Sequence, residues 1–193
     1  MRGEASTAHT PHALPLSPHT VNQSHFDLFG LPATYAIDRE RLDAAYRELQ
    51  SAVHPDRFAA RPDAEQRLAM QRATQVNEAY QTLKHPVNRG VYLLQLQGVD
   101  ALDARDTQMA PAFLMQQMEW REAIDDARAA RDPASLDALT AELRAEHRRI
   151  EAALAGLLDD AKDVDGARET VRQLRFMDKL IAEVGDVIEE LEG

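Results

Sequence analysis

The chain of 193 residues contains no cysteine. It therefore forms no disulfides, and it has no thiolate to ligate zinc or an iron–sulfur cluster or to act as a nucleophile. No apolar run approaches the roughly 20 residues that a membrane-spanning helix needs. Gly-rich phosphate loops, the His-Glu-x-x-His zinc motif and the signatures of common nucleophiles are also missing. We therefore predict a protein that is not an enzyme and that holds no metal or cofactor.

Basic side chains are scarce, because 22 Lys and Arg stand against 33 Asp and Glu, for a net charge of −11. Residues 1–100 hold 10 basic and 11 acidic side chains, whereas residues 101–193 hold 12 and 22. Nucleic acids and anionic membranes attract an excess of Lys and Arg, so we expect neither as a main partner. The uneven distribution of charge instead indicates two units with different partners.

The first 22 residues show no helical period and are rich in Pro, Thr, Ser, Ala and His. They lack the long apolar stretch of a secretory signal, and Arg2 is their only arginine, whereas mitochondrial transit peptides are rich in arginine. We expect residues 1–22 to be a disordered tail on a cytoplasmic protein. The histidines of this tail are more simply explained as solvated side chains than as weak metal ligands.

From residue 24 onward the apolar residues recur with the spacing of amphipathic helices, and no segment keeps the alternation of a strand. Ser24 and Asp38 are suited to cap two helices, of which the second ends before Pro55. A third helix is predicted from Asp63, in a capping box with Gln66, up to Pro86. The apolar stripe of this third helix comprises Leu68, Val76, Ala79, Tyr80 and Leu83.

A short fourth helix is predicted from Arg89 to Leu96, and Gly90 within it should cost about 1 kcal/mol of helix stability. Residues 98–110 are polar without a sustained period, so we place a linker there. Three longer amphipathic helices follow, at about 111–131, from the Asp132-Pro133 cap onward, and at about 164–191. On short connections they form an antiparallel bundle. The sequence thus predicts an all-α fold with domains at 23–97 and 111–193.

The first helix of this predicted bundle has two apolar faces. A core-facing stripe is formed by Phe113, Trp120, Ile124 and Ala127. About 100° to 200° away on the helical wheel lie Leu114, Met115 and Met118, among charged residues. Since a three-helix bundle needs to bury only one face, the second face either packs against a neighbour or binds a partner. Phe176, at the edge of the apolar arc of the last helix, either extends the same face or packs as a phenylalanine at the edge of the core.

The tripeptide His54-Pro55-Asp56 lies between two amphipathic helices of similar length. Its context, Tyr46-Arg47-Glu48-Leu49 before it and Asn77-Glu78-Ala79-Tyr80 after it, resembles the J-domain of DnaJ-type co-chaperones. The resemblance implies a helical hairpin whose loop docks on a DnaK-type ATPase and triggers ATP hydrolysis there. The alternative is a plain helix–turn–helix in which proline and aspartate merely end one helix and start the loop.

In such a J-domain, His54, Pro55 and Asp56 form the docking loop, and basic side chains steer the acidic chaperone toward it. The arginines that match this steering role are Arg39, Arg41, Arg47 and Arg57. Ala52-Val53 stand where the J-domain pattern has Lys-Tyr, so one steering charge and one aromatic ring are missing. This difference favours a specialised chaperone over a general one.

Four separated segments, in order, resemble the HscB family of J-domain co-chaperones, which serve bacterial iron–sulfur cluster biogenesis. They are Phe26–Pro32, Tyr92–Leu94, Phe113–Glu122 and Val171–Leu180. The resemblance implies an L-shaped arrangement of two domains, in which the J-domain engages the ATPase HscA and the bundle binds the scaffold IscU. No cysteine-pair zinc module of the mitochondrial branch is present, which favours the bacterial form.

The scaffold-binding positions that this resemblance implies are Leu114, Met115, Met118, Glu119, Arg121, Glu122 and Phe176. Met118 stands where leucine is usual, which is a tolerable exchange. Two other interpretations are a J-domain co-chaperone with a different client and a helical adaptor without chaperone function. The carboxylate pairs Asp159-Asp160 and Glu189-Glu190 are expected to form solvated faces, and His147 is expected at the surface or edge rather than as a ligand.

Overall fold

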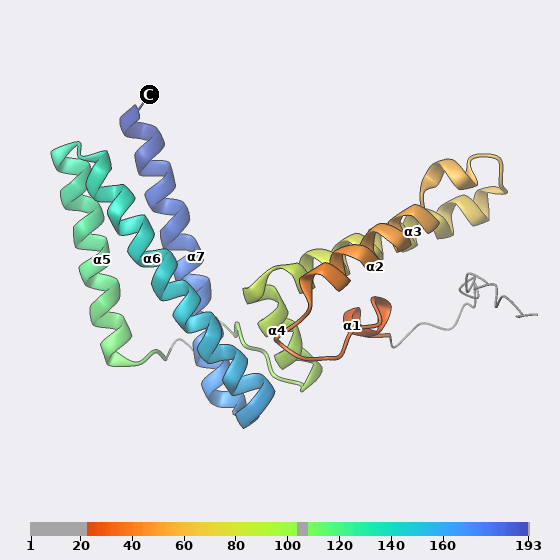
Figure 1. Ribbon diagram of the computed structural model, residues 1–193, viewed down its shortest axis with the longest axis horizontal. Coiled ribbons are helices and arrows are strands. Elements are labelled where there is room, and N and C mark those ends of the chain that lie inside the picture. Colours follow the sequence, from red (N-terminus) through yellow and green to blue (C-terminus); the bar gives the residue numbers. More distant parts are fainter. Residues whose placement is uncertain (1–22, 104–107, 193) are drawn as a thin grey trace, which may run out of the picture.

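The computed structural model describes residues 23–103 and 108–192, and every regular element in these ranges is a helix. Two helical units meet at an angle and give the molecule the outline of an L (Figure 1). The all-α fold and its L shape are therefore confirmed. The tail at residues 1–22 lies outside the described residues, so the expectation of disorder there stays a prediction. No helix in the described ranges is long and apolar enough to cross a membrane.

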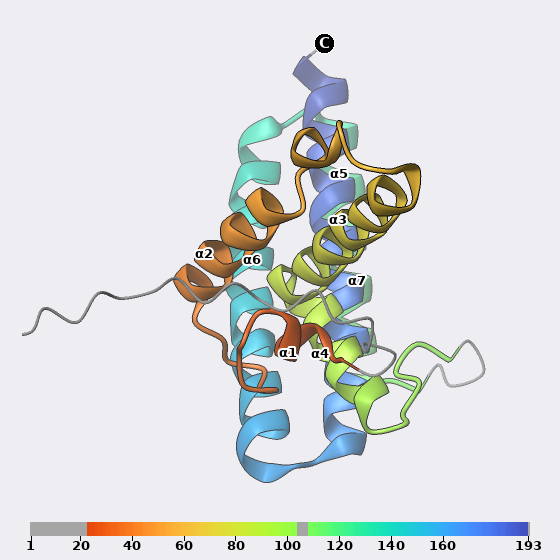
Figure 2. The ribbon, with the colours of Figure 1, turned by 90° about the vertical axis from the view of Figure 1, so that its right-hand side faces the viewer.

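The first unit is built around a long helical hairpin. Its elements are α1 (His25–Leu28), α2 (Arg39–Ala52), the 3-10 turn η1 (Pro55–Phe58), α3 (Asp63–Lys84) and α4 (Pro86–Leu96). Figure 2 looks along this hairpin and shows α2 and α3 side by side, with α1 and α4 at one end of it. The opposite end carries η1, which makes it the free tip of the first unit (Figure 1).

The first two helices begin as their sequences predict. The Ser24 side chain accepts a hydrogen bond from the backbone N–H of Asp27 at 3.1 Å, and the Asp27 carboxylate accepts one from the N–H of Ser24, which completes a capping box. Asp38 accepts from the N–H of Arg41 at 3.1 Å and caps α2. These side chains satisfy backbone donors that the first helical turn leaves free.

The predicted capping box of α3 is wrong. The helix begins after Pro62, which has no side chain able to cap it. Gln66 instead donates through Nε2 to the carbonyl oxygen of Arg61 at 2.9 Å, so it closes the loop that follows η1. The prediction that Leu68 belongs to the core is also wrong, because its side chain is 46% exposed. The rest of the predicted stripe is buried as expected, namely Val76, Ala79, Tyr80 and Leu83.

The second unit is an antiparallel three-helix bundle. Its elements are α5 (Pro111–Ala130), α6 (Pro133–Ala155), a π-helical turn η2 (Gly156–Ala161) and α7 (Val164–Glu192). Asp132 caps α6 by accepting from the N–H groups of Ala134 and Ser135 at 3.1 and 3.2 Å. The apolar stripes of the three helices form the core, with these residues buried: Phe113, Trp120, Ile124, Ala127, Leu136, Leu139, Leu143, Ile150, Leu154, Val171, Leu174, Met177 and Val184. Leu157, Ile181 and Ile188, which the same helical periodicity predicts to be in the core, are only partly buried against it.

The two units meet where α4 packs against α6 and α7, and Gly90 allows this close approach. A Cβ atom at Gly90 would lie 3.0 Å from Cδ2 of Leu154 and 3.0 Å from Cγ2 of Val171. Such a contact is tighter than van der Waals packing tolerates without movement of the neighbours. The intrinsic cost of a glycine within a helix, about 1 kcal/mol, is therefore offset here by the packing of two units against each other.

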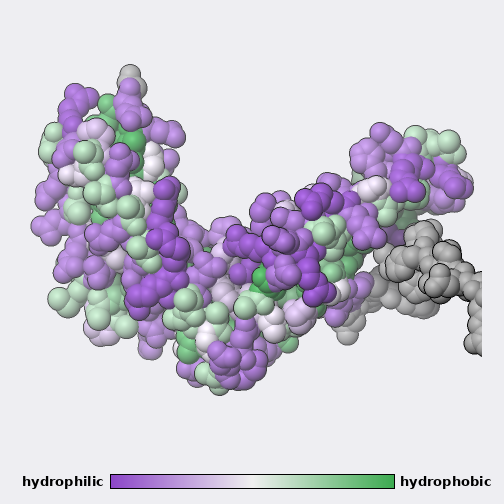
Figure 3. All heavy atoms as spheres, viewed as in Figure 1, coloured by the Kyte–Doolittle hydropathy of each residue, from purple (hydrophilic) through white to green (hydrophobic). Residues whose placement is uncertain are grey.

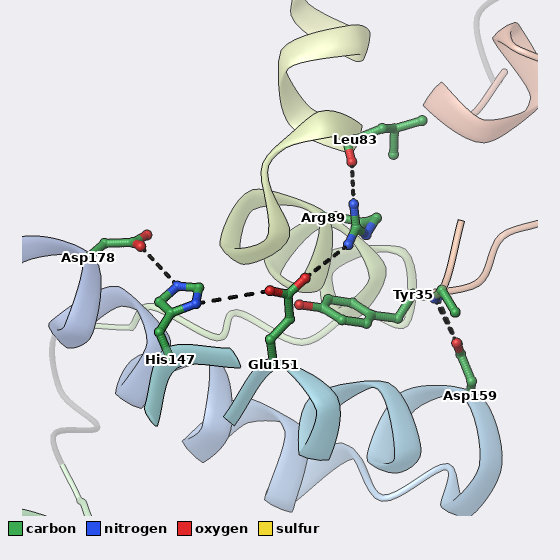
Figure 4. A network of polar contacts seen from close by, with 8 residues as sticks. Tyr35, Leu83, Arg89, His147, Glu151, Asp159 and Asp178 are labelled. Carbon is green, nitrogen blue, oxygen red and sulfur yellow. Dashed lines mark hydrogen bonds and ion pairs between the residues drawn. The ribbon is translucent and has the colours of Figure 1, made fainter. Parts of the chain in front are cut away.

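Arg89 is the buried charge of this junction, with only 4% of its surface exposed. Its Nη1 donates to the carbonyl oxygen of Leu83 at 2.7 Å, and its Nη2 lies 3.8 Å from Oε1 of Glu151 on α6 (Figure 4). The guanidinium also lies 4.7 Å from the centre of the Tyr35 ring. Burial raises the pKa of the Tyr35 hydroxyl far above its usual range, so the ring stays neutral next to Glu151.

Asp159 fastens the loop before α2 to the bundle, contrary to the prediction that it is a solvated carboxylate. Its Oδ1 accepts from the N–H of Tyr35 at 2.7 Å (Figure 4). Its Oδ2 accepts from the N–H of Ala36 at 2.8 Å. The π-helical turn η2 holds Asp159 at this place, whereas its neighbour Asp160 is exposed. Both bonds link residues more than 120 positions apart in sequence.

His147 lies at the edge of the same junction. Its Nε2 is 3.0 Å from Oδ1 of Asp178 on α7, and its Nδ1 is 4.0 Å from Oε2 of Glu151 (Figure 4). The Asp178 carboxylate also lies 3.8 Å from Nε2 of His85, which precedes α4. The edge position predicted for His147 is confirmed. Through its contact with Asp178, His147 links α6 to α7 next to the junction with the first unit.

We predict that Asp159→Ala lowers the free energy of unfolding by about 1–3 kcal/mol, because two backbone N–H groups lose a charged acceptor. Urea denaturation followed by circular dichroism measures this loss. Asp160→Ala removes the same side chain one position later and is expected to change stability by less than about 0.5 kcal/mol. Equal effects of the two substitutions would show that Asp159 does not fasten the units together.

Candidate docking surfaces

The first candidate surface is the docking loop, residues 54–56, at the free tip of the hairpin. His54 caps η1, because its Nδ1 accepts a hydrogen bond from the N–H of Asp56 at 3.3 Å. With Nδ1 as the acceptor, the neutral imidazole carries its proton on Nε2 and keeps a donor for a partner. The side chains of His54 and Asp56 are 55% and 89% exposed. The loop therefore presents one donor and one carboxylate on a short, ordered turn.

A set of aromatic and amide side chains fixes the hairpin that carries this loop. The ring of Tyr46 on α2 stacks on that of Tyr80 on α3, with centroids 3.9 Å apart. The Tyr46 hydroxyl donates to Oδ1 of Asn77 at 2.9 Å and accepts from Nε2 of Gln50 at 2.8 Å. Tyr80 in turn donates to Asp43 at 2.9 Å. These contacts hold α2 and α3 in register, so the loop needs little ordering when a partner binds.

Basic and polar side chains surround a hollow beside the loop. Its lining residues are Arg47, Gln50, Ser51, His54 and Arg57. Arg57 is held in place, because its Nη1 donates to the carbonyl oxygen of Ser51 at 3.2 Å. Among these described lining residues the two arginines carry full positive charge and none is acidic, so the hollow suits an acidic partner group. Gln50 and Ser51 were not predicted, although they follow Arg47 by three and four residues and therefore share one face of α2 with it.

The structure does not bring all four predicted arginines together. Arg47 and Arg57 line the hollow, whereas Arg39 and Arg41 lie in the first turn of α2. At a rise of 1.5 Å per residue, that turn is about 15–20 Å from the docking loop. Arg39 and Arg41 are exposed and add positive charge to the hairpin, but they make no part of the hollow.

The second candidate surface is the apolar patch, which we define as Leu114, Met115 and Met118 on α5. These side chains are 46%, 65% and 71% exposed. No described residue of the first unit or of the bundle buries them, so the alternative in which a neighbour covers this face is wrong. Apolar colour gathers at the lower end of the bundle in Figure 3, over the first turns of α5. The predicted charged residues Glu119, Arg121 and Glu122 are exposed beside the patch.

Phe176 connects the apolar patch to the core. It is half-buried on α7, and its ring meets that of Phe113 edge to face with centroids 5.8 Å apart. The guanidinium of Arg121 lies 5.8 Å from the centre of the same ring. The edge-of-core position predicted for Phe176 is confirmed. Because the bundle fixes one side of the ring, only its outer part is free to contact a partner.

Neither surface is arranged to hold a metal. Within residues 23–103 and 108–192, no three or more His, Asp or Glu side chains are grouped as metal ligands. The exposed side chains of both surfaces are instead those of protein–protein contacts: an apolar centre with a charged rim on the bundle, and a polar loop beside a basic hollow on the hairpin.

Comparison with known proteins identifies the family of this chain. The family model of the DnaJ domain matches residues 24–92, and that of the HSCB C-terminal oligomerisation domain matches residues 109–185. Co-chaperone protein HscB homologues from Burkholderia mallei and Burkholderia pseudomallei are each 58% identical over 173 residues, which are 90% of this chain and 98% of theirs. The chain belongs to the HscB family of co-chaperones. The names of these relatives describe a co-chaperone and not an enzyme.

Solved HscB structures agree with this fold. Chaperone HscB from Vibrio cholerae is 39% identical, with a TM-score of 0.76 over 87% of this chain and 99% of its own. Human co-chaperone HscB is 25% identical, with a TM-score of 0.79 over 95% of this chain and 91% of its own. The Jac1 co-chaperone from Saccharomyces cerevisiae, 22% identical, shares the fold with a TM-score of 0.70. The predicted J-domain and the predicted HscB resemblance are both confirmed.

The different exposure of Phe176 and Met118 predicts different effects on stability. Phe176→Ala removes the ring that packs on Phe113, so we expect the free energy of unfolding to fall by about 1–3 kcal/mol. Met118→Ala truncates a side chain that is 71% exposed and is expected to change it by less than about 0.5 kcal/mol. Thermal or urea unfolding of both variants tests this difference. A loss of similar size in both would mean that Met118 also packs on the bundle.

Proposed function

We propose that this HscB co-chaperone stimulates ATP hydrolysis by a specialised DnaK-type chaperone, HscA, and delivers the iron–sulfur scaffold IscU to it in the bacterial cytoplasm. The observation that supports this proposal most is the exposed apolar patch on the bundle, on a different unit from the exposed docking loop. One chain therefore offers two separate surfaces. In this role the protein assists iron–sulfur cluster assembly and holds no cluster itself.

The docking loop is suited to engage the chaperone. Asp56 supplies an exposed carboxylate for a basic group of the ATPase, and His54 supplies a donor from an already ordered turn. Arg47 and Arg57 favour an acidic surface next to it, and Arg39 and Arg41 extend the positive charge along α2. Pro55 restricts the loop and reduces the entropy lost on docking.

The apolar patch is suited to hold the scaffold. A partner that buries an exposed leucine or methionine side chain gains about 1.5–3 kcal/mol for each when burial is complete. Glu119, Arg121 and Glu122 surround the patch with both signs of charge, which sets the orientation of the partner more than its affinity. Phe176 adds the outer part of an immobilised ring, which costs little entropy to bind.

We expect His54→Gln to abolish stimulation of the HscA ATPase while leaving IscU binding unchanged. Glutamine lacks the ring nitrogen that caps η1 and accepts from the N–H of Asp56, and its flexible amide does not hold a donor at the position of the imidazole Nε2. Steady-state ATP hydrolysis by purified HscA measures the first property, and isothermal titration with IscU measures the second. Undiminished stimulation by His54→Gln would contradict the docking role of the loop.

We expect the double substitution Leu114→Ala and Met118→Ala to weaken IscU binding about 10- to 100-fold, from the apolar area lost. Phe176 stays intact in this variant because it also supports the core. The matched control is Leu68→Ala with Met70→Ala, since these side chains are 46% and 63% exposed on the other unit. The control is expected to bind IscU normally.

These assays also separate the proposal from its alternatives. Unchanged IscU affinity in the Leu114 and Met118 variant contradicts the assignment of the patch. Stimulation of the chaperone without any binding of IscU by the wild-type chain favours a J-domain co-chaperone with a different client. Absence of both activities favours a helical adaptor without chaperone function.

A further inference from the structure

Two of the three exposed methionines in the described part of the chain lie on the apolar patch, and the third, Met70, lies on α3. Met115 and Met118 are 65% and 71% exposed, and the chain has no cysteine. Thioethers are therefore its only side chains with an oxidisable sulfur. Positions 115 and 118 are three residues apart on a helix, so both sulfurs lie on one face and enter the same contact.

We propose that Met115 and Met118 are a reversible oxidation site that releases the scaffold when a peroxide oxidises them. This inference rests on the proposed function of the apolar patch. A sulfur lone pair attacks one oxygen of hydrogen peroxide, an S–O bond forms and the O–O bond breaks. The proton of the transferred oxygen moves to the departing oxygen, which leaves as water. The sulfur is oxidised by two electrons to a sulfoxide and the peroxide is reduced.

Oxidation changes the patch from apolar to polar. A sulfoxide oxygen is a strong hydrogen-bond acceptor, and a partner that covers it with apolar side chains leaves it without a donor. We expect the Kd for the scaffold to rise about 10- to 100-fold, which corresponds to the desolvation of one or two such groups. The first unit and its docking loop carry neither methionine, so stimulation of the chaperone in the absence of scaffold is expected to stay unchanged.

The other described methionines differ in their access to peroxide. Met177 is fully buried in the bundle core, with 0% exposure. Met109 is half-buried, and its sulfur accepts a hydrogen bond from Nε2 of Gln117 at 3.2 Å. Met70 is 63% exposed, but it lies on α3 in the other unit. A mild dose of peroxide should therefore oxidise Met115, Met118 and Met70 before Met109 and Met177.

Leucine provides the matched control for the sulfur. It is apolar, of similar volume and not oxidisable by peroxide, so Met115→Leu with Met118→Leu removes the oxidation chemistry, and the effect of peroxide on this variant is measured against its own affinity before treatment. Met70→Leu removes an equally exposed sulfur that lies away from the patch. Because all three positions are exposed, these variants are expected to fold like the wild type.

The experiment compares IscU affinity of the full chain before and after mild treatment with hydrogen peroxide, with peptide mass spectrometry to locate the added oxygen. We expect treated wild type and treated Met70→Leu to bind about 10- to 100-fold more weakly. Treated Met115→Leu/Met118→Leu is expected to keep its affinity. A methionine sulfoxide reductase should restore the binding of the treated wild type.

Two results would overturn the inference while leaving the proposed function intact. One is unchanged affinity of wild type whose Met115 and Met118 are shown to be oxidised. The other is an equal loss of affinity in the treated Met115→Leu/Met118→Leu variant. Absence of binding by the untreated wild type is a different result, because it contradicts the proposed function and the inference together.

Discussion

The junction between the hairpin unit and the bundle is the constraint on which the rest of the molecule depends. Gly90 lets α4 approach Leu154 and Val171 at a distance that no side chain tolerates without movement. Next to it, Arg89 is buried between its own unit and Glu151, and a buried charge that loses its partner is strongly destabilising. At the far edge of the same contact, the Asp159 carboxylate accepts hydrogen bonds from two backbone N–H groups of the hairpin unit. Close packing, the ion pair of a buried arginine and hydrogen bonds to a carboxylate thus fix the angle of the L together.

The helices of the bundle differ in their contacts with the hairpin unit. These contacts come from α6, the π-helical turn and α7, through Leu154, Glu151, Asp159, Val171 and Asp178. Helix α5 lies on the far side of the bundle, so its outer face is free to carry the apolar patch (Figure 1). The docking loop lies at the opposite end of the hairpin from the junction. The fold therefore separates the two candidate surfaces and holds their relative position, as expected if both partners bind one chain at once.

Local patterns predicted most of the helices, because caps and helical periodicity depend on nearby residues. The N-caps at Ser24, Asp38 and Asp132 and the buried stripes of the bundle follow directly from such patterns. The capping box predicted at residue 63 failed because Gln66 bonds to the preceding loop instead. Asp159 could not be predicted, since its partners lie more than 120 positions away and its sequence context is only charged. Gly90 is a similar case. The sequence predicts that glycine lowers the stability of the helix, whereas its role in letting α4 pack closely on the bundle is seen only in the structure.

We propose that one chain holds a DnaK-type chaperone and an iron–sulfur scaffold at the same time, on surfaces that the junction between the two units keeps apart. Native mass spectrometry of the full chain mixed with purified HscA and IscU, in the presence of ATP, tests this claim most directly. We predict a complex that contains one copy of each protein, formed without displacement of either partner. Separate complexes with each partner, together with competition between HscA and IscU for this chain, would contradict the claim.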